Sequence, residues 1–174
     1  MVGREITQIF PKRKVQIGET ILDVKGLGRQ GYFKDISFSV RKGEILALTG
    51  LVGAGRTEVC ESIFGIYPFS EGSVLLSGQK VVFSHPSEAI AAGLGYLPED
   101  RQKQGLVLNW DITKNISLSS LILFSKFGWM NEKKEQKEAG KLSNTLAIKA
   151  SSVFDKVSNL SGGNQQKVIV AKLL

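Results

Sequence analysis

Cysteine and histidine are almost absent from this chain of 174 residues, each occurring once. The single cysteine, Cys60, excludes an intrachain disulfide and a cysteine-based zinc cluster, and it gives little reason to expect redox chemistry. We expect Cys60 to be a small buried apolar residue. The single histidine, His85, lies between Ser84 and Pro86, ahead of a predicted helix. We expect it to be an exposed loop residue rather than a metal ligand or a base.

Long apolar segments are also lacking. No run approaches the roughly 20 consecutive apolar residues that a membrane-spanning helix needs, and residues 1–16 have no apolar core of a secretory signal. The sequence shows neither an internal repeat nor a low-complexity tract. Because 42% of the residues are hydrophobic and 22% are charged, the composition is typical of one globular domain with a buried core. We therefore expect a cytosolic protein.

The charge is strongly positive, with a formal net charge of +7 and a pI near 9.5. Such a balance suits a nucleic-acid binder, a membrane-surface protein or a protein that handles polyphosphates. Between residues 132 and 141, however, lysines are interleaved with Glu132, Glu135 and Glu138. This pattern favours the solvated face of a helix with near-neighbour ion pairs over a dedicated basic patch.

The order of the apolar segments predicts an α/β fold. Residues 36–40 alternate between apolar and polar side chains, as in a strand with one buried face, whereas residues 45–49 resemble a strand that is covered on both sides. We expect strands at residues 21–27, 35–40, 45–49, 74–76, 81–83 and 94–97. Helices are expected after the glycine-rich loop up to Gly65, from Pro86 to Gly93, across residues 111–150, and from Ser161 onward.

A glycine-rich loop, GLVGAGRTE, follows the predicted strand at residues 45–49 and precedes a helix. Its spacing matches the phosphate-binding pattern G-x-x-x-x-G-K-[ST] except that Arg56 replaces the lysine. Free backbone N–H groups at such a helix start attract phosphate, and Thr57 offers a hydroxyl to magnesium. The alternative is a simple glycine-rich turn. The candidate nucleotide-binding residues are Gly50, Leu51, Val52, Gly53, Ala54, Gly55, Arg56, Thr57 and Glu58.

A second glycine-containing motif, LSGGNQQKV, occupies residues 160–168 and also precedes a predicted helix. It aims further N–H groups and a hydroxyl at an anion. The candidate anion-binding residues here are Leu160, Ser161, Gly162, Gly163, Asn164 and Gln165. Two anion-binding helix starts in one small domain therefore need an explanation.

The second motif resembles the LSGGQ signature of ATP-binding cassette (ABC) ATPases, and its NQQK continuation resembles the ATPases of bacterial sugar importers. GLVGAGRTE at residues 50–58 and YLPEDR at residues 96–101 resemble the second, C-terminal cassette of monosaccharide importers of the ribose, xylose, galactose and autoinducer-2 type. Residues 1–5 and 10–13 resemble the connector that joins the two cassettes of such proteins.

This resemblance implies a P-loop NTPase core with an antiparallel β subdomain and an inserted helical subdomain, incomplete at the C-terminus. Residues 1–19 would be the inter-cassette connector, and residues 20–174 a partial nucleotide-binding domain. Within it, residues 20–100 would form the β subdomain and the phosphate-loop core, 111–156 the helical subdomain, and 160–174 the signature motif with its helix.

The resemblance also implies ATP and Mg²⁺ as cofactors. In the family two cassettes pair head to tail, so the signature of one completes the ATP site of the other. Arg56 marks a degenerate loop, for which we expect binding without efficient turnover. Glu99 stands at the position of the family's Q-loop glutamine, and with Thr57 it would contact the magnesium ion.

Partners and location follow from the same family. We expect the first cassette of the same polypeptide or a second copy, membrane permease subunits, and indirectly an extracellular sugar-binding protein, but no nucleic acid. The protein would be peripheral on the cytoplasmic face of the cell membrane. The family continues past the signature with an acidic Walker B strand and a switch histidine. We therefore expect no complete set of catalytic residues in this segment, no useful hydrolysis by it alone, and marginal stability, swapping or self-association.

Three alternatives stay open. The domain could be a docking module that binds no nucleotide, which loss of ATP binding would reveal. It could belong to a nucleoside importer. It could also be a chromatin-type or repair ATPase of the same fold, for which steep salt-dependent DNA binding would be expected.

Overall fold

The computed structural model describes residues 15–174. The chain divides into two compact units, a first unit that ends at Leu94 and a second that runs from Gly95 to Leu174. We describe each unit by itself. Most of the connector predicted for residues 1–19 lies outside the described residues, and its assignment stays a prediction.

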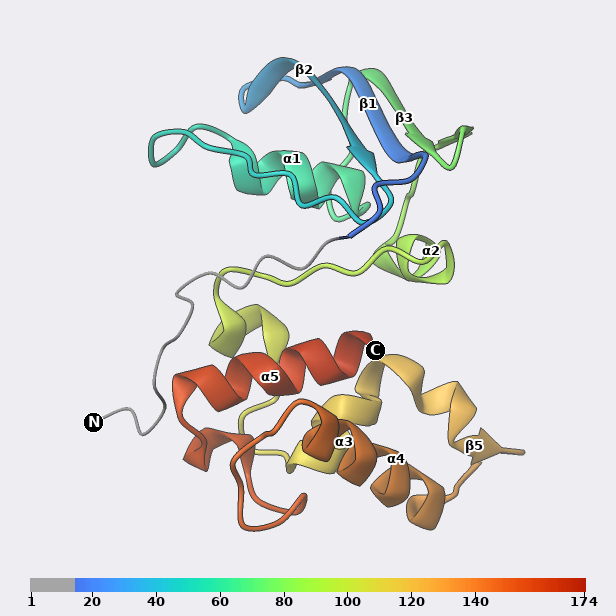
Figure 1. Cartoon of the computed structure of the whole chain (residues 1–174), viewed down its shortest axis with the longest axis vertical. Coiled ribbons are helices and arrows are strands. Elements are labelled where there is room, and N and C mark those ends of the chain that lie inside the picture. The colour runs from blue at the N-terminus through green and yellow to red at the C-terminus, as the bar shows by residue number, and fades with distance from the viewer. Residues whose placement is uncertain (1–14) are drawn as a thin grey trace. The chain divides into compact units, whose positions relative to one another are not determined.

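The first unit contains a four-stranded antiparallel sheet in the order β2-β1-β3-β4 (Figure 1). The strands are β1 (Thr20–Arg29), β2 (Phe33–Arg41), β3 (Glu71–Leu76) and β4 (Gln79–Val81). In β2 the alternation predicted for residues 36–40 is confirmed, because Ile36, Phe38 and Val40 are half-buried while the serines between them are exposed. Helix α1 (Arg56–Ile63) packs Val59 and Ile63 into the same core as the strand residues Val24, Leu27 and Val74.

Helix α2 (Pro86–Ala91) begins where the sequence predicts it, with Pro86 in its first turn and His85 as the N-cap residue. His85 is exposed, as expected. Cys60, by contrast, is exposed, so the prediction of a buried cysteine is wrong. Successive helical residues differ by about 100° around the axis, and α1 turns Val59 rather than Cys60 toward the sheet. Partial desolvation, followed by the charge of Glu61, raises the pKa of the Cys60 thiol.

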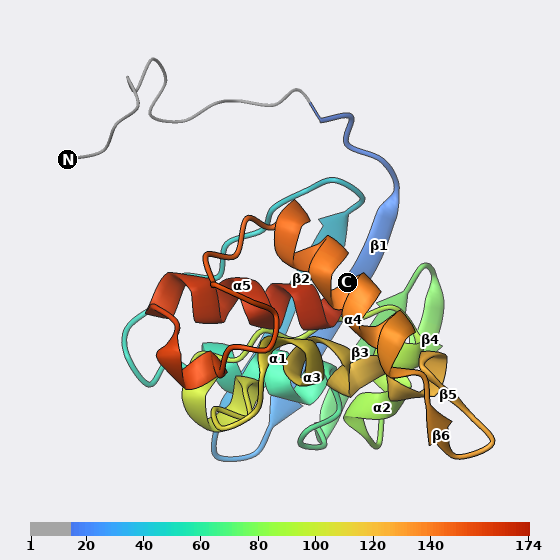
Figure 2. The same cartoon turned by 90° about the horizontal axis from the view of Figure 1, so that it is seen from below.

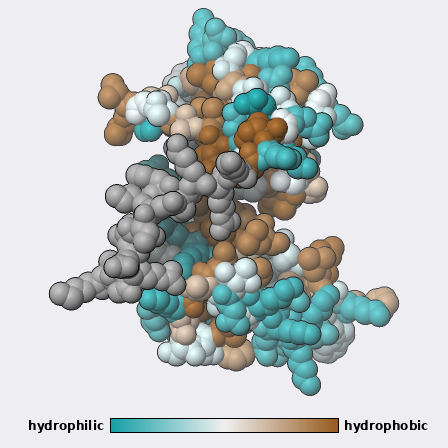
Figure 3. Space-filling model, in the orientation of Figure 1, coloured by the Kyte–Doolittle hydropathy of each residue, from teal (hydrophilic) through white to brown (hydrophobic). Residues whose placement is uncertain are grey.

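Two predicted buried strands do not form. Residues 45–49 and 94–97 have no strand pairing among the described residues, and the side chain of Ile45 is 97% exposed. An apolar segment becomes a strand only when a neighbour supplies the ladder hydrogen bonds, and the four-stranded sheet does not include either segment. Hydrophobic side chains accordingly reach the molecular surface (Figure 3).

The strand predicted at residues 81–83 is displaced toward the N-terminus and spans Gln79–Val81. Ser77 and Gly78 both have positive φ, 48° and 81°, and form a two-residue hairpin turn. Pairing therefore resumes at once, with Leu76 opposite Gln79. The strands predicted at residues 74–76 and 81–83 leave four residues between them, whereas two are sufficient for the hairpin turn.

The second unit is mainly helical. Its α-helices are α3 (Ile112–Ser117), α4 (Glu132–Thr145) and α5 (Gly162–Leu173). A π-helical turn spans Arg101–Gly105, and 3-10 helices span Leu118–Leu123 and Val157–Asn159. The core shared by these elements contains Ile112, Ile116, Ala139, Val157, Val168 and Ile169.

The helical prediction for residues 111–150 missed a β-hairpin. Strands β5 (Ser125–Lys126) and β6 (Trp129–Met130) pair antiparallel and project from the helices (Figure 2). Phe127 and Gly128 have φ of 50° and 83°, which suits a two-residue hairpin turn with positive φ at both positions. Gly128 is typical of such a turn, but the residue before it is usually asparagine, aspartate or glycine. Phe127 at that position gives no sequence indication of a hairpin.

A buried asparagine organises the segment between the π-helical turn and α3. The Asn115 Oδ1 atom accepts a hydrogen bond from the Val107 N–H at 2.8 Å, and Nδ2 donates to the carbonyls of Val107 and Asp111, both at 3.0 Å. Asn115 is completely buried. Its side chain therefore replaces the backbone partners that this irregular segment lacks.

No helix among residues 15–174 combines the length and the apolar character needed to cross a bilayer.

A buried serine in α1 provides a test of the first unit. The Ser62 hydroxyl is buried and has no hydrogen-bond partner among the described residues. We expect Ser62→Ala to leave the free energy of unfolding unchanged or to raise it by about 1 kcal/mol, because an unsatisfied hydroxyl is removed. Urea denaturation followed by circular dichroism measures this.

The matched control is Ser117→Ala in the second unit. There the buried hydroxyl donates to the buried carboxylate of Glu135. Removing this partner leaves a buried charge without its hydrogen bond and should cost about 1–3 kcal/mol. Equal losses for the two variants would contradict the expectation for Ser62.

Candidate functional site

The predicted phosphate loop is shaped by its glycines. Gly53 and Gly55 have φ of 82° and 81°, values that side chains with a Cβ rarely adopt. The Ala54 N–H donates to the Leu51 carbonyl at 3.1 Å and closes a turn. Helix α1 starts directly after Gly55, its N-cap residue, which has no side chain to accept a hydrogen bond from the first turn. The N–H groups of that turn are therefore available to an anion.

Arg56 lies over this loop. It is exposed, and its Nη2 atom donates to the Leu51 carbonyl at 3.5 Å, so the guanidinium folds back toward the turn. Thr57 and Glu58 follow in the first turn and are half-buried, whereas Leu51, Val52, Gly53 and Ala54 form an exposed tip. Exposed amides, a guanidinium and a hydroxyl in one loop fit a phosphate group.

The donor set for a metal is weaker. No three histidine, cysteine, aspartate or glutamate side chains converge anywhere in residues 15–174. At the loop, Thr57 offers a single hydroxyl. One such ligand can bind magnesium only when phosphate oxygens supply further ligands. The predicted pair of Thr57 and Glu99 stays a prediction.

A hollow of about 690 Å³ lies beside the phosphate loop, and no sequence pattern predicts it. It is lined by residues 28–34 together with Ser70 and Glu71. A Cβ on Gly55 would lie 3.0 Å from the Tyr32 carbonyl oxygen, so the hollow and the loop are neighbours. The Arg29 guanidinium lies over the rings of Tyr32 and Tyr67, with 3.9 and 4.4 Å from its carbon to the ring centroids. Such stacked planar groups offer a surface to a flat ring.

The signature motif forms the start of α5. Ser161 is the N-cap residue, as predicted, and Leu160 before it is extended. The Ser161 hydroxyl does not cap the helix but accepts from Asn164 Nδ2 at 3.0 Å, while Asn164 Oδ1 accepts from the Lys149 N–H at 3.0 Å. The N–H groups of Gly162 and Gly163 belong to the first helical turn and have no intrahelical acceptor. The motif therefore has the geometry that an anion site requires.

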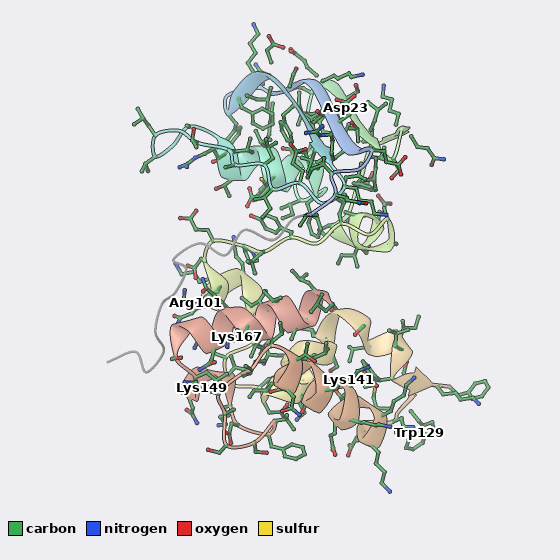
Figure 4. The ribbon with its side chains drawn as sticks, in the orientation of Figure 1. Asp23, Arg101, Trp129, Lys141, Lys149 and Lys167 are labelled. Carbon is green, nitrogen blue, oxygen red and sulfur yellow. The ribbon has the colours of Figure 1, made fainter. Side chains whose placement is uncertain are left out.

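Gln165 ties this helix start to a distant segment. It is buried, its Nε2 atom donates to the Val157 carbonyl at 3.2 Å, and its Oε1 atom accepts from Arg101 Nε and Gln102 Nε2, each at 3.4 Å. A Cβ on Gly162 would lie 2.7 Å from Arg101 Nη2, so the guanidinium rests against the signature glycine. Figure 4 shows Arg101 beside the N-terminal end of α5. In the sequence, YLPEDR carries a family resemblance but no sign of this contact with the signature.

Two lysines fix α5 along its length. Lys167 Nζ donates to the Ala147 carbonyl and Lys172 Nζ to the Gly105 carbonyl, both at 2.6 Å. Burial lowers the pKa of the Lys172 ammonium. The helix that carries the signature is thus held at its middle and near its C-terminal end.

Asp100 shapes the chain between Glu99 and Arg101. Its carboxylate accepts from the N–H groups of Lys103 and Gln102, at 3.1 and 3.2 Å, and caps the π-helical turn. The hydrogen bond from the Lys103 N–H, followed by the Lys103 side chain, holds the pKa of Asp100 below its ordinary value of 3.8. Glu99 itself is exposed, and its carbonyl accepts from the Arg101 N–H at 3.2 Å.

The shift gives Asp100 a defined pH dependence. Because the pKa is lower in the folded state, the capping contribution is fully present above the unfolded value and is lost as the pH falls through the folded value. We expect an NMR titration of the Asp100 carboxyl to have its midpoint below 3.8. In Asp100→Asn the difference in melting temperature from the original chain should shrink as the pH falls through that midpoint. A difference that is constant with pH would contradict the assignment.

The two units together define the class of protein. The fold is that of solved ATP-binding cassettes. A cassette in a dimeric post-hydrolysis state bound to ADP and phosphate superposes with a TM-score of 0.70 at 20% identity, covering 88% of this chain and 69% of that one. The component cbiO1 of an ABC transporter complex from Clostridium perfringens gives 0.69 at 18% identity, covering 90% and 61%. The predicted cassette fold is confirmed.

The ABC transporter family model matches residues 33–174, and the chain belongs to this family. Among curated proteins, it is 45% identical over 172 residues to the ribose import ATP-binding protein of Bacillus licheniformis, covering 99% of this chain. It is 46% identical over the same length to the corresponding protein of Oceanobacillus iheyensis. The chain spans 35% of the length of each.

Proposed function

We propose that this chain is a nucleotide-binding segment of an ABC importer for ribose or a related monosaccharide, in which ATP drives carbohydrate uptake. The observation that carries the proposal is the signature motif at the start of α5, in a chain 45% identical to a ribose import ATP-binding protein. The phosphate loop at α1 supports it independently, because its open amides and Arg56 suit a polyphosphate.

In this proposal the loop of residues 50–58 holds the phosphates. The first-turn amides and the Arg56 guanidinium bind the oxygens, and the Thr57 hydroxyl contacts a magnesium ion that arrives with the nucleotide. The hollow beside Gly55 receives the base, with Arg29 and Tyr32 as its stacking surface. Hydrolysis of ATP by water to ADP and phosphate would supply the free energy for transport.

Arg56 separates binding from turnover. A guanidinium is a rigid planar fork, whereas a lysine ammonium is a compact charge that fits between two phosphates. The loop therefore binds ATP but turns it over poorly. The signature residues, Leu160, Ser161, Gly162, Gly163, Asn164 and Gln165, complete the ATP site of a partner cassette, and Glu99 contacts the magnesium ion.

The proposed partners follow the same scheme. The partner cassette is either the first cassette of the same polypeptide or a second copy. Permease subunits place the assembly on the cytoplasmic face of the membrane, and an extracellular sugar-binding protein acts through them.

The test is an ATP titration of the 174-residue chain by calorimetry, with and without Mg²⁺. We expect saturable, magnesium-dependent binding. Thr57→Ala should weaken it roughly tenfold to a hundredfold, as expected for a lost interaction with a charged ligand. Arg56→Ala should weaken binding as well, whereas Arg56→Lys should retain it.

Thr145→Ala is the matched control. Thr145 lies in the last turn of α4, is exposed, and donates only to the Lys141 carbonyl. Its replacement should leave the affinity for ATP unchanged. If no saturable binding occurs, the chain is a docking module and the proposal fails. If ATP binds but Thr57→Ala and Thr145→Ala behave alike, the nucleotide is not held through Thr57 and the assignment of the phosphate loop fails.

A further inference from the structure

The β5–β6 hairpin exposes large aromatic side chains. Phe127 is 92% exposed and Trp129 is 83% exposed. Figure 4 shows Trp129 at the outer edge of the second unit. The preceding 3-10 helix adds the exposed side chains of Ile122 and Leu123. We call these four residues the apolar tip.

Folding alone does not explain this composition. Phe127 has φ of 50°, a left-handed conformation that asparagine or glycine adopts at lower cost. The turn directs the phenyl ring into solvent, where it contributes nothing to the core. A large apolar residue that is both strained and exposed indicates a surface that becomes covered when the protein binds a partner or a membrane.

The charges beside the apolar tip are mainly positive. Lys126 Nζ lies 5.9 Å from the centroid of the Phe127 ring. Lys134 Nζ donates to the Leu123 carbonyl at 2.9 Å. Lys133 is also exposed, next to Lys134 at the start of α4. Two ammonium groups, those of Lys126 and Lys134, thus lie beside the apolar tip.

The glutamates of α4 offset little of this charge at the apolar tip. Glu135 is buried and accepts from the Ser117 hydroxyl. Glu138 pairs with Lys141 further along the helix, at 3.7 Å. Glu132 is exposed in the first turn of α4, where the exposed Lys133 and Lys134 outnumber it. The surface is therefore cationic as well as apolar.

We propose that the apolar tip inserts into the headgroup layer of an anionic membrane. Phenylalanine and tryptophan beside lysines favour that layer, because the rings enter the acyl boundary while the ammonium groups meet lipid phosphates. Phe127 projects on a two-residue turn and Trp129 follows directly in β6, a position that suits a deformable lipid surface better than a preformed protein pocket. This direct contact with lipid goes beyond the proposed nucleotide binding and does not depend on it.

Tryptophan fluorescence tests the proposal directly. The chain has two tryptophans, Trp110 and Trp129, so Trp110→Phe leaves Trp129 as the only emitter. With vesicles of phosphatidylcholine mixed with phosphatidylglycerol, we expect a blue shift of the Trp129 emission and quenching by brominated acyl chains. Vesicles of phosphatidylcholine alone should bind much more weakly, and added salt should release the protein.

Variants separate specific insertion from general stickiness. In co-sedimentation with the mixed vesicles, the double change of Phe127→Ser and Trp129→Ser should reduce binding by about tenfold or more, since two buried rings are lost. Lys126→Glu should reduce it through charge. Ile45→Ser is the matched control, because Ile45 in the first unit is 97% exposed but has no place in the apolar tip.

Three results would overturn the proposal. These are an unchanged Trp129 emission, equal binding to neutral vesicles, and an equal loss on Ile45→Ser. A Trp129 shift that requires purified permease and not lipid would assign the hairpin to a protein partner instead. ATP titration of the double variant should match the original chain, so the outcome for lipid is distinguishable from the outcome for nucleotide.

Discussion

Replacing Gly72 with alanine is expected to lower the free energy of unfolding of the first unit by about 3 kcal/mol or more. Gly72 lies in β3 with φ of 87°. A Cβ built there overlaps the backbone carbonyls of Gly26 and Lys25. β1 has a register irregularity between Lys25 and Gly28 where it pairs with β3. The two backbones approach so closely at this point that no side chain fits between them.

Gly78→Ala is the matched control for this substitution. Gly78 has nearly the same backbone conformation, with φ of 81°, but a Cβ there meets no atom of the described residues within 4 Å. Its cost is therefore the conformational penalty alone, about 1–2 kcal/mol. Urea denaturation of both variants measures the difference. If the two losses are equal, the strands separate without cost and close approach contributes nothing.

Replacing Asn115 with leucine should lower the free energy of unfolding of the second unit by about 2–4 kcal/mol. The substitution removes the acceptor of the Val107 N–H and the donor to the carbonyls of Val107 and Asp111. Leucine fills a similar volume, so the loss reports on polar groups left without partners rather than on a cavity. Urea denaturation followed by circular dichroism measures the loss.

Two further variants sharpen this test. Asn115→Asp keeps the shape but replaces the Nδ2 donor with a carboxylate oxygen that faces two carbonyls, so it should be at least as harmful as leucine near neutral pH. Asn144→Leu, at an exposed position in the last turn of α4, should change stability by no more than about 0.5 kcal/mol. A small effect of both Asn115 variants would show that water satisfies the loop equally well.

The elements that the sequence predicted correctly have local causes. The alternation of residues 36–40 predicts β2, Pro86 predicts the start of α2, and Ser161 predicts the start of α5. Each signal lies within a few residues of the structure that it predicts. The strands predicted at residues 45–49 and 94–97 do not form. A buried strand needs neighbouring strands to pair with, and a local sequence pattern does not show whether these are present.

In the candidate site, too, the local features were predicted from the sequence and the long-range contacts were not. Both glycine motifs are contiguous in sequence, and each was found at a helix start. Their surroundings were not found, because they join distant segments. Strand β2, the phosphate loop and α1 separate Arg29 from Tyr67, and 64 positions separate Arg101 from Gln165. Spacing along the chain holds no information about such pairs unless the fold is already known.

The outward position of Cys60 on α1 has a practical consequence. It is the only thiol of the chain and lies four residues beyond Arg56, about one helical turn from the phosphate loop. A maleimide dye can therefore be attached at a single place without engineering any residue, although its raised pKa calls for mildly alkaline labelling. The emission of that dye would then follow ligand occupancy of the loop in real time.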